Sequence, residues 1–399
     1  MRRLIVLQHY FFWGDKKLDK SKLYELIGSY NDEMLELWKN LVNVDSGPDN
    51  HEGVKKVSDI VAEFLRNIGF LTRTINFPNA GNMLVAEYGD MTKPFVIITG
   101  HMDTVFNKGA ATTRAFKIEA GKAYGPGVLD MKGGITIALF VLKALLAMNY
   151  RKHPIKIIFA GDEEIGHSCS TAPQEFIKEG IGAFAAFNME TGFPDNGLVV
   201  ERKGMYQFML EVFGRGAHVG NAPKNGRNAI KEIASKLLDI EALTDWDKGN
   251  TFNVGVIEGG TVCNSVAAYA KIICDLRFVD SSYLPDVKAA LQKIVEKQYV
   301  EGTKTVLTSI VEFSAMKRLD TTMELFALVK RTAQEEGFRP VTAKAVGGAS
   351  DSAYLTNIGI PTVCAMGVIG EHNHTVEEFA VVDTMLERAK LLAAVLVNV

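Results

Sequence analysis

Three strongly apolar stretches of this chain each end in a loop that carries acids or a histidine. They cover residues 95–99, 155–160 and 183–189. Segments with helical spacing alternate with them, and similar spacing predicts helices over 22–45 and 53–69 before the first run. Strands that are apolar on both faces are typical of parallel sheets covered by helices on both sides. The sequence therefore predicts an α/β fold with a mostly parallel sheet.

The loops after these runs carry His101, Asp103, Glu163, Glu164 and Glu190. In a parallel sheet, ligands bind beyond the carboxyl ends of the strands, so these side chains are expected to lie together. A single His–Asp pair is as often an ordinary surface pair, but several acids at one edge repel one another without a cation. Imidazole with carboxylate fits zinc, with Mn²⁺ or Co²⁺ as alternatives.

The pattern changes at about Lys203. From there to about residue 316 it reads strand, helix, strand, strand, helix, strand, which is typical of a ferredoxin-like α+β unit. The α/β pattern returns after Arg318. We therefore expect a catalytic domain formed by residues 1–202 and 317–399, interrupted by an inserted domain over 203–316.

The composition excludes several classes of protein. The 399 residues are 23% charged with a net charge of −3, so there is no basic surface for nucleic acid. No apolar run approaches the ~18 residues that span a bilayer. The N-terminal run Leu4–Leu7 resembles the start of a signal peptide, but Gln8 and His9 interrupt it. Four scattered cysteines without framework spacing indicate reduced thiols, so we expect a soluble, cytoplasmic protein without membrane or nucleic-acid partners.

Four ordered motifs carry a family resemblance. They are His101-Met-Asp-Thr-Val, the segment 123–134 that ends in Asp130-Met-Lys-Gly-Gly, Asp162-Glu-Glu, and Glu190. Together they resemble the di-zinc metallopeptidases of family M20, and most closely the glutamate carboxypeptidase (carboxypeptidase G-like) branch. The resemblance runs from about residue 35 to the C-terminus. It implies a zinc-peptidase-like catalytic domain with an inserted lid and dimerisation domain.

The resemblance implies two zinc ions per subunit, with Co²⁺ or Mn²⁺ possible. The residues that match the family's zinc ligands are His101, Asp130, Glu164, Glu190 and His374, with Asp130 bridging the two ions. His372 is the alternative to His374. Asp103 matches the residue that orients His101, and Glu163 matches the general base. The family's cis peptide bond corresponds to Asp130–Met131.

The inserted domain has its own matches. His218, within Gly214–Gly220, matches a lid histidine that reaches the partner subunit's active site, although alone it would be read as a surface residue. Asn264 and Arg277 match positions that hold the substrate's carboxylate, and Arg277 alone would be read as a surface charge on a strand. Lys317 and Arg318 lie near a family arginine but lack its following proline, which leaves glutamate specificity open.

The resemblance therefore predicts a homodimeric metallo-exopeptidase. It would cleave the amide bond next to a free carboxylate, releasing a C-terminal amino acid from a small peptide or an N-acyl amino acid. The alternatives are an N-acyl-amino-acid deacylase, an aminopeptidase or dipeptidase of the same family, or a non-catalytic dimeric metal-binding scaffold.

Overall fold

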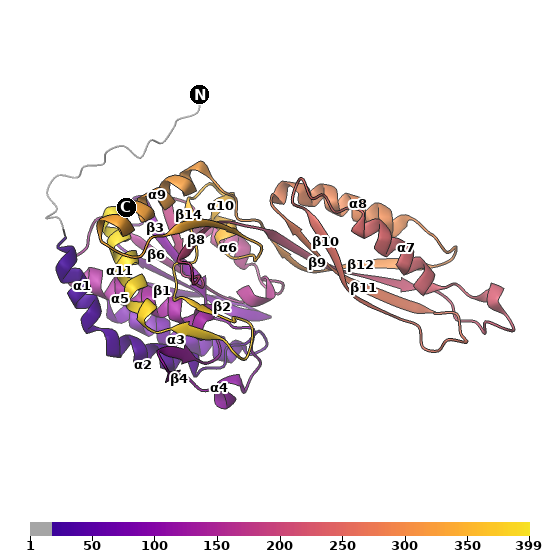
Figure 1. Cartoon of the computed structure of the whole chain (residues 1–399), viewed down its shortest axis with the longest axis horizontal. Helices are drawn as coiled ribbons and strands as arrows, with labels where there is room; N and C mark the ends of the chain where they lie inside the picture. The colour runs from indigo at the N-terminus through magenta and orange to yellow at the C-terminus, as the bar shows by residue number, and fades with distance from the viewer. Residues whose placement is uncertain (1–17) are drawn as a thin grey trace, which may run out of the picture.

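A computed structural model describes residues 18–399 of the chain. The first 17 residues, which include the Leu4–Leu7 run, lie outside the described part. Figure 1 shows two bodies: a larger one that contains both the N-terminal half and the C-terminal helix, and a smaller one formed by the middle of the chain. Among residues 18–399, none of the helices combines the length and the apolar character needed to cross a membrane.

A six-stranded sheet forms the centre of the larger body. Its strand order is β1-β2-β6-β3-β7-β14. The strands are β1 (Leu71–Phe77), β2 (Ala80–Tyr88), β3 (Phe95–His101), β6 (Ile155–Gly161), β7 (Ala183–Asn188) and β14 (Thr362–Val363). The neighbours β6, β3, β7 and β14 are parallel, whereas β1 and β2 run antiparallel at one edge. The predicted parallel strands are confirmed, and the sheet as a whole is mixed.

Both faces of this sheet are covered, as the apolar strands require. In β3, Val96 and Ile98 pack into the core under the N- and C-terminal helices, while Phe95 and Ile97 face a second core. The helices of the larger body are α1 (Lys20–Ser29), α2 (Asn31–Val42), α3 (His51–Asn67), α4 (Ala110–Thr113), α5 (Gly133–Ala147), α6 (Ala172–Gly180), α9 (Asp320–Glu335), α10 (Ser352–Asn357) and α11 (Asp383–Asn398). Because successive side chains of a strand point to opposite faces and both faces are covered, the strands are apolar at successive positions.

The prediction of one continuous helix over 22–45 is wrong, because the structure has two helices there, α1 and α2. The chain leaves the helix at Tyr30, which has ψ of 4°, and α2 then begins with Asn31 and the acids Asp32 and Glu33 in its first turn. Acids favour a helix N-terminus because of the helix dipole, so this run of polar residues starts a new helix rather than extending the old one.

The smaller body is an antiparallel sheet with two helices. Its elements are β9 (Gly204–Phe213), α7 (Ala229–Glu241), β10 (Thr251–Gly259), β11 (Tyr269–Phe278), α8 (Leu284–Glu296) and β12 (Lys304–Phe313), and its strand order is β10-β11-β9-β12. A separate apolar core lies between this sheet and its helices. The ferredoxin-like pattern is confirmed, while the limits of the two domains at 202 and 317 stay a prediction.

Short pairings complete the larger body, and the sequence pattern did not predict them. One small sheet has the order β15-β16-β5-β4, and β13 pairs with β8 in parallel. The strands are β4 (Lys117–Glu119), β5 (Lys122–Tyr124), β8 (Gly197–Arg202), β13 (Thr342–Val346), β15 (Gly370–Glu371) and β16 (Phe379–Val381). Most have only two or three residues, too few for a period-two pattern to be visible.

Candidate metal centre

The predicted site residues emerge where three adjacent parallel strands end. His101 is the last residue of β3, Glu163 and Glu164 follow the end of β6, and Glu190 lies two residues beyond β7. Because β6, β3 and β7 are neighbours in that order, their carboxyl ends meet at one edge. The topology therefore brings together side chains that are up to 89 positions apart in the sequence.

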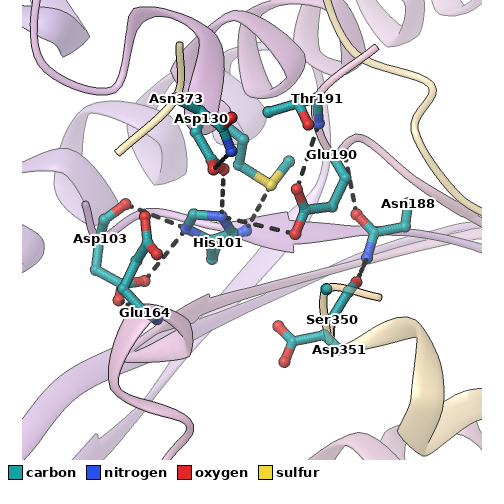
Figure 2. Close-up of polar contacts among 12 residues, drawn as sticks. His101, Asp103, Asp130, Glu164, Asn188, Glu190, Thr191, Ser350, Asp351 and Asn373 are labelled. Atoms are coloured by element: carbon teal, nitrogen blue, oxygen red, sulfur yellow. Dashed lines mark hydrogen bonds and ion pairs between the residues drawn. The ribbon is translucent and has the colours of Figure 1, made fainter. Parts of the chain in front are cut away.

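His101 lies at the centre of this cluster. Its Nε2 lies 3.1 Å from Asp130 Oδ1 and 3.8 Å from Glu190 Oε1. Its Nδ1 lies 3.1 Å from the Asp103 backbone carbonyl oxygen and 3.4 Å from Asp103 Oδ1. Figure 2 shows Asp103 and Glu164 on one side of the imidazole ring and Glu190 on the other. A ring held between acids in this way is typical of a metal-ligating histidine with a carboxylate behind it.

Asp130 lies between two imidazole rings. Its Oδ2 lies 3.2 Å from His374 Nε2, which in turn lies 3.2 Å from Glu164 Oε2. The other candidate, His372, packs its ring against Phe379 at 5.8 Å between ring centroids. The geometry therefore brings His374, rather than His372, into the acid cluster.

The turn that presents Asp130 is held by backbone geometry and by one buried acid. Gly127 has φ of 71°, a conformation that favours glycine, and the Asp130–Met131 peptide bond is cis, as the resemblance implied. The Glu378 carboxylate accepts hydrogen bonds from the backbone N–H groups of Gly127, Leu129 and Asp130 at 2.8–3.0 Å. Glu378 thus fixes the turn from outside the cluster.

Glu163 and Glu164 direct their carboxylates to different parts of the cluster. Glu164 lies with His101 and Asp130, whereas Glu163 lies with His101 and Glu190; in each group one potential ligand atom per residue lies within 4.8 Å of the others. Asp103 supports this divergence, because its Oδ2 accepts a hydrogen bond from the Glu164 N–H at 2.9 Å. The adjacent acids can therefore have different roles.

The electrostatics of the cluster indicate that a cation belongs there. Burial raises the pKa of Glu163 well above its usual value, and burial together with Asp130 raises the pKa of Glu164 to about 7. Glu164 Oε1 is buried and has no hydrogen-bond partner among the described residues. Carboxylate oxygens with imidazole nitrogens are a donor set that suits zinc and other divalent metals, so the residues fit a metal centre.

Two of the predicted lid residues lie together, but far from this cluster. His218 pairs with Ser265 in an isolated bridge, and Val219 N–H donates to the Asn264 carbonyl at 3.2 Å. The segment that carries His218 follows the end of β9 that is remote from the larger body, and a ten-residue strand spans ~30 Å. His218 Nδ1 accepts from Gly220 N–H at 3.1 Å and from Asn221 N–H at 3.2 Å, which orients the exposed ring.

Arg277 lies at the opposite end of the lid sheet from Asn264, so one chain does not bring these two residues together. Arg277 pairs with Asp275 through Nε (2.7 Å) and Nη2 (3.1 Å), and its Nη1 donates to the Gly347 carbonyl at 3.2 Å. Residues two apart on a strand share a face, so the Asp275 partner was readable from the sequence. The guanidinium is already partly engaged within its own chain.

Sequence reasoning assigned no role to two residues that hold the cluster. Asn373 donates from Nδ2 to Asp130 Oδ2 at 3.1 Å, and Glu378 holds the Asp130 turn as described above. Both flank His374 in the sequence, so a search for polar neighbours of that histidine would have found them.

Two known proteins are similar to this chain over most of its length. Carboxypeptidase G2 of Pseudomonas sp. (strain RS-16) is 26% identical over 345 residues, covering 84% of this chain and 82% of that protein. An uncharacterized protein of Bacillus subtilis (strain 168) is 26% identical over 375 residues, covering 91% and 97%.

Solved structures share the fold. Aminopeptidase PepT from Bacillus cereus ATCC 10987 matches with a TM-score of 0.76 at 22% identity, covering 92% of this chain and 98% of that chain. The M20 family metallo-carboxypeptidase Sso-CP2 from Sulfolobus solfataricus matches with a TM-score of 0.75 at 19% identity, covering 92% and 99%. The family model for peptidase family M20/M25/M40 matches residues 97–398, and the chain belongs to this family.

Proposed function

We propose that this chain is a dinuclear metallo-carboxypeptidase that cleaves the amide bond next to a free carboxylate. The observation that carries the proposal is the state of Glu163. Its carboxylate borders the His–acid cluster, yet it has no hydrogen-bond or ion-pair partner within residues 18–399. A purely structural metal site needs no unpaired acid beside it, whereas hydrolysis needs a base at that place.

The proposed metal sites share Asp130. One would use His101, Asp130 and Glu190, and the other Asp130, Glu164 and His374; zinc is the expected metal. Bound metal ions would polarise the scissile carbonyl and lower the pKa of water toward about 7. The geometry also groups Glu163 with His101 and Glu190, so a ligand role for Glu163 is the competing assignment.

In this proposal Glu163 moves the proton. Its carboxylate takes a proton from the attacking water and later delivers it to the nitrogen of the leaving amine. Burial, together with the nearby acids, raises the pKa of Glu163, so its carboxyl group can hold that proton between the two steps. Asp103 keeps Nδ1 of His101 oriented, and thereby keeps Nε2 directed at Asp130.

His218 and Asn264 are proposed to act across a dimer. Their distance from the cluster of the same chain excludes a role there, so His218 would stabilise the developing negative charge in the partner subunit's site. The strand β10 lies at the edge of the lid sheet and exposes Val256 and Ile257. An exposed apolar edge strand is a surface that a second copy can pair with.

Recognition of the substrate's carboxylate is assigned to Arg277, with Asn264 contributed by the partner. The two N–H groups of Arg277 that do not contact Asp275 or Gly347 remain for a ligand, and its side chain is 32% exposed. The similarity to a protein named carboxypeptidase G2 favours recognition of the substrate's C-terminal carboxylate. The similarity to the aminopeptidase PepT makes recognition of the substrate's N-terminal amine the second candidate.

Location in the cytoplasm is part of the same proposal. All four cysteines are free, and Cys169 and Cys263 are exposed. Exposed free thiols persist in a reducing compartment.

The test is a panel of acyl-glutamates, acyl-alanines and dipeptides, each paired with its C-terminal primary amide. We expect metal-dependent hydrolysis of the free acids and little of the amides. Equal rates on acid and amide, or dependence on a free amine, would favour the aminopeptidase. No hydrolysis by the metal-loaded protein would favour the scaffold.

A further inference from the structure

A histidine that lacked a partner pattern in the sequence lies in a buried cluster beneath the candidate site. The ring of His167 is held between two carboxylates: Nδ1 lies 2.7 Å from Asp162 Oδ1, and Nε2 lies 2.6 Å from Asp351 Oδ1. Its side chain is 0% exposed, and those of both acids are 1% exposed. We refer to these three residues as the Asp162–His167–Asp351 cluster.

The ring has no nitrogen left for other chemistry. Because each nitrogen faces a carboxylate oxygen, both donate a hydrogen, and the imidazole carries a positive charge between two negative ones. Burial alone would lower the pKa of His167, yet Asp351 and Asp162 together hold it well above its usual value. The second oxygens, Asp162 Oδ2 and Asp351 Oδ2, have no hydrogen-bond partner in the described chain. The buried acids therefore depend on His167.

The backbone at His167 is held in an uncommon conformation. Its φ is 54°, directly after Gly166 at 64°. A residue with a side chain rarely adopts this left-handed region, so the surroundings must hold it there. The His167 N–H donates to the Asp162 carbonyl at 3.1 Å, which closes the loop that carries Glu163 and Glu164.

The cluster joins three parts of the molecule. Asp162 directly precedes Glu163, and Asp351 ends the 347–351 loop, in which the Gly347 carbonyl accepts a hydrogen bond from Arg277 of the lid. The His167 ring also packs against Phe313, the last residue of the lid strand β12, at 5.5 Å between centroids. Figure 2 shows Asp351 below the His101 cluster, on a different segment from its acids.

We propose that His167 is a positioning residue that fixes the Glu163 loop against the 347–351 loop. This rests on the proposed function, in which Glu163 moves the proton. Removing the ring leaves two buried carboxylates facing each other, and the loop must shift to separate them or admit water. Glu163 would then be misplaced for proton transfer. Metal binding would change less, because the Asp103 carboxylate also holds Glu164 through its N–H at 2.9 Å.

The test uses His167→Gln, Asp351→Asn and the double variant. A glutamine donates to only one of the two carboxylates, so we expect kcat to fall by about 10- to 100-fold, with KM within about threefold and metal content unchanged. In the double variant, the glutamine amide introduced at position 167 can donate to Asp162 and accept from the asparagine amide introduced at position 351. We expect this to recover most of the lost kcat, to within about fivefold of wild type. A merely structural role would give no such recovery.

The matched control is His153→Gln. His153 lies just before β6, at the opposite end of the strands from the metal ligands, and contacts the Val399 carbonyl and the Phe184 ring. The His153→Gln variant should have lower thermal stability and an unchanged kcat. Hydrogen exchange supplies a readout that needs no activity: His167→Gln should raise uptake in peptides covering 162–170 and 347–351, and His153→Gln should not.

The outcomes separate the two proposals. If folded, metal-loaded His167→Gln keeps wild-type kcat, or its uptake over 162–170 is unchanged, the positioning role is wrong. If that variant does not fold, Asp351→Asn decides: a kcat loss of about tenfold supports the role, and an unchanged kcat overturns it. If the wild type hydrolyses no substrate in the panel, the proposed function fails, and hydrogen exchange alone decides whether the cluster fixes the loop.

Discussion

The edge of the central sheet and the remote end of the lid differ in how complete they are within one chain. At the sheet edge, His101 and His374 each have a ring nitrogen 3.1–3.2 Å from the Asp130 carboxylate, and these residues come from different segments of the chain. At the lid end, His218 is exposed and contacts only its own loop and the neighbouring Asn264 segment, as far as the described residues show. The sheet edge brings together the potential metal ligands within one chain, whereas the lid end holds oriented polar groups that do not contact the potential metal ligands of the same chain.

Under the proposed function, the two regions would have different roles. Metal binding and proton transfer need distances fixed to within tenths of an ångström, and a packed sheet edge suits that requirement. A group that stabilises charge on a substrate can arrive from another molecule, provided that the partner places it. Under the proposed function, the lid end would acquire its role only in a dimer, while the sheet edge should keep its metals in any state of association.

The largest expected effect is at the sheet edge. Glu163→Gln keeps the shape of the side chain but removes the proposed base, so kcat should fall by about 10²- to 10⁴-fold. Both metals should remain bound, as measured by elemental analysis. Glu164→Ala is the matched comparison and should lose metal instead. Metal loss by the Gln variant would make Glu163 a ligand and reverse the two roles.

The lid end should give the next largest effect. His218→Ala removes a donor to the developing negative charge, so kcat should fall by about 10²- to 10³-fold with metal content unchanged. The exposed neighbour Val219 provides the control, and Val219→Ala should behave like the wild type in steady-state kinetics. If both variants keep full activity, the lid end has no part in the chemistry.

The support of the sheet edge can be weakened without touching a proposed ligand. Glu378→Gln replaces one acceptor oxygen of a buried carboxylate that receives three N–H groups, so the Asp130 turn should loosen. We expect metal affinity to fall by about 10- to 100-fold in a chelator competition assay. Exposed Glu377→Gln should leave affinity unchanged; an unchanged affinity for Glu378→Gln would remove this residue from the account.

The smallest expected effect is at the junction between the two regions. Arg277→Ala should lower kcat/KM on a free acid by about tenfold, because its guanidinium is one-third exposed and shared with Asp275. On the matching primary amide the change should stay within about twofold. Lys271→Ala on the same strand is the control. Equal losses on acid and amide would mean that Arg277 supports the 347–351 loop rather than the ligand.

The parts of the molecule that could be predicted are those that depend on patterns of neighbouring residues. The apolar strands are visible as runs, and the parallel order of β6, β3 and β7 brings His101, Glu163 and Glu190 to one edge. The resemblance added Asp130 and His374, whose contacts arise from a turn and a loop that no periodicity reveals. The resemblance implies different roles for the neighbouring Glu163 and Glu164, and their carboxylates belong to different groups of ligand atoms.

The parts that could not be predicted depend on distant partners. His167 has one partner five residues away and another 184 residues away, so its sequence neighbourhood shows no pattern. The helix break at Tyr30 was hidden because apolar spacing continues across it while the backbone does not. The opposite placement of Asn264 and Arg277 follows from the ten-residue strand β11, because Asn264 precedes its start and Arg277 lies near its end, and the motifs do not encode this separation.

The division between the two regions is tested most directly by mixing inactive Glu163→Gln and His218→Ala homodimers and allowing subunit exchange. In the heterodimer, one site combines an intact sheet edge with an intact partner lid, and the other site lacks both. Random exchange of equal amounts should restore about a quarter of wild-type activity, because half of the dimers are mixed and each has one working site. No recovery despite exchange shown by mass spectrometry would contradict the account.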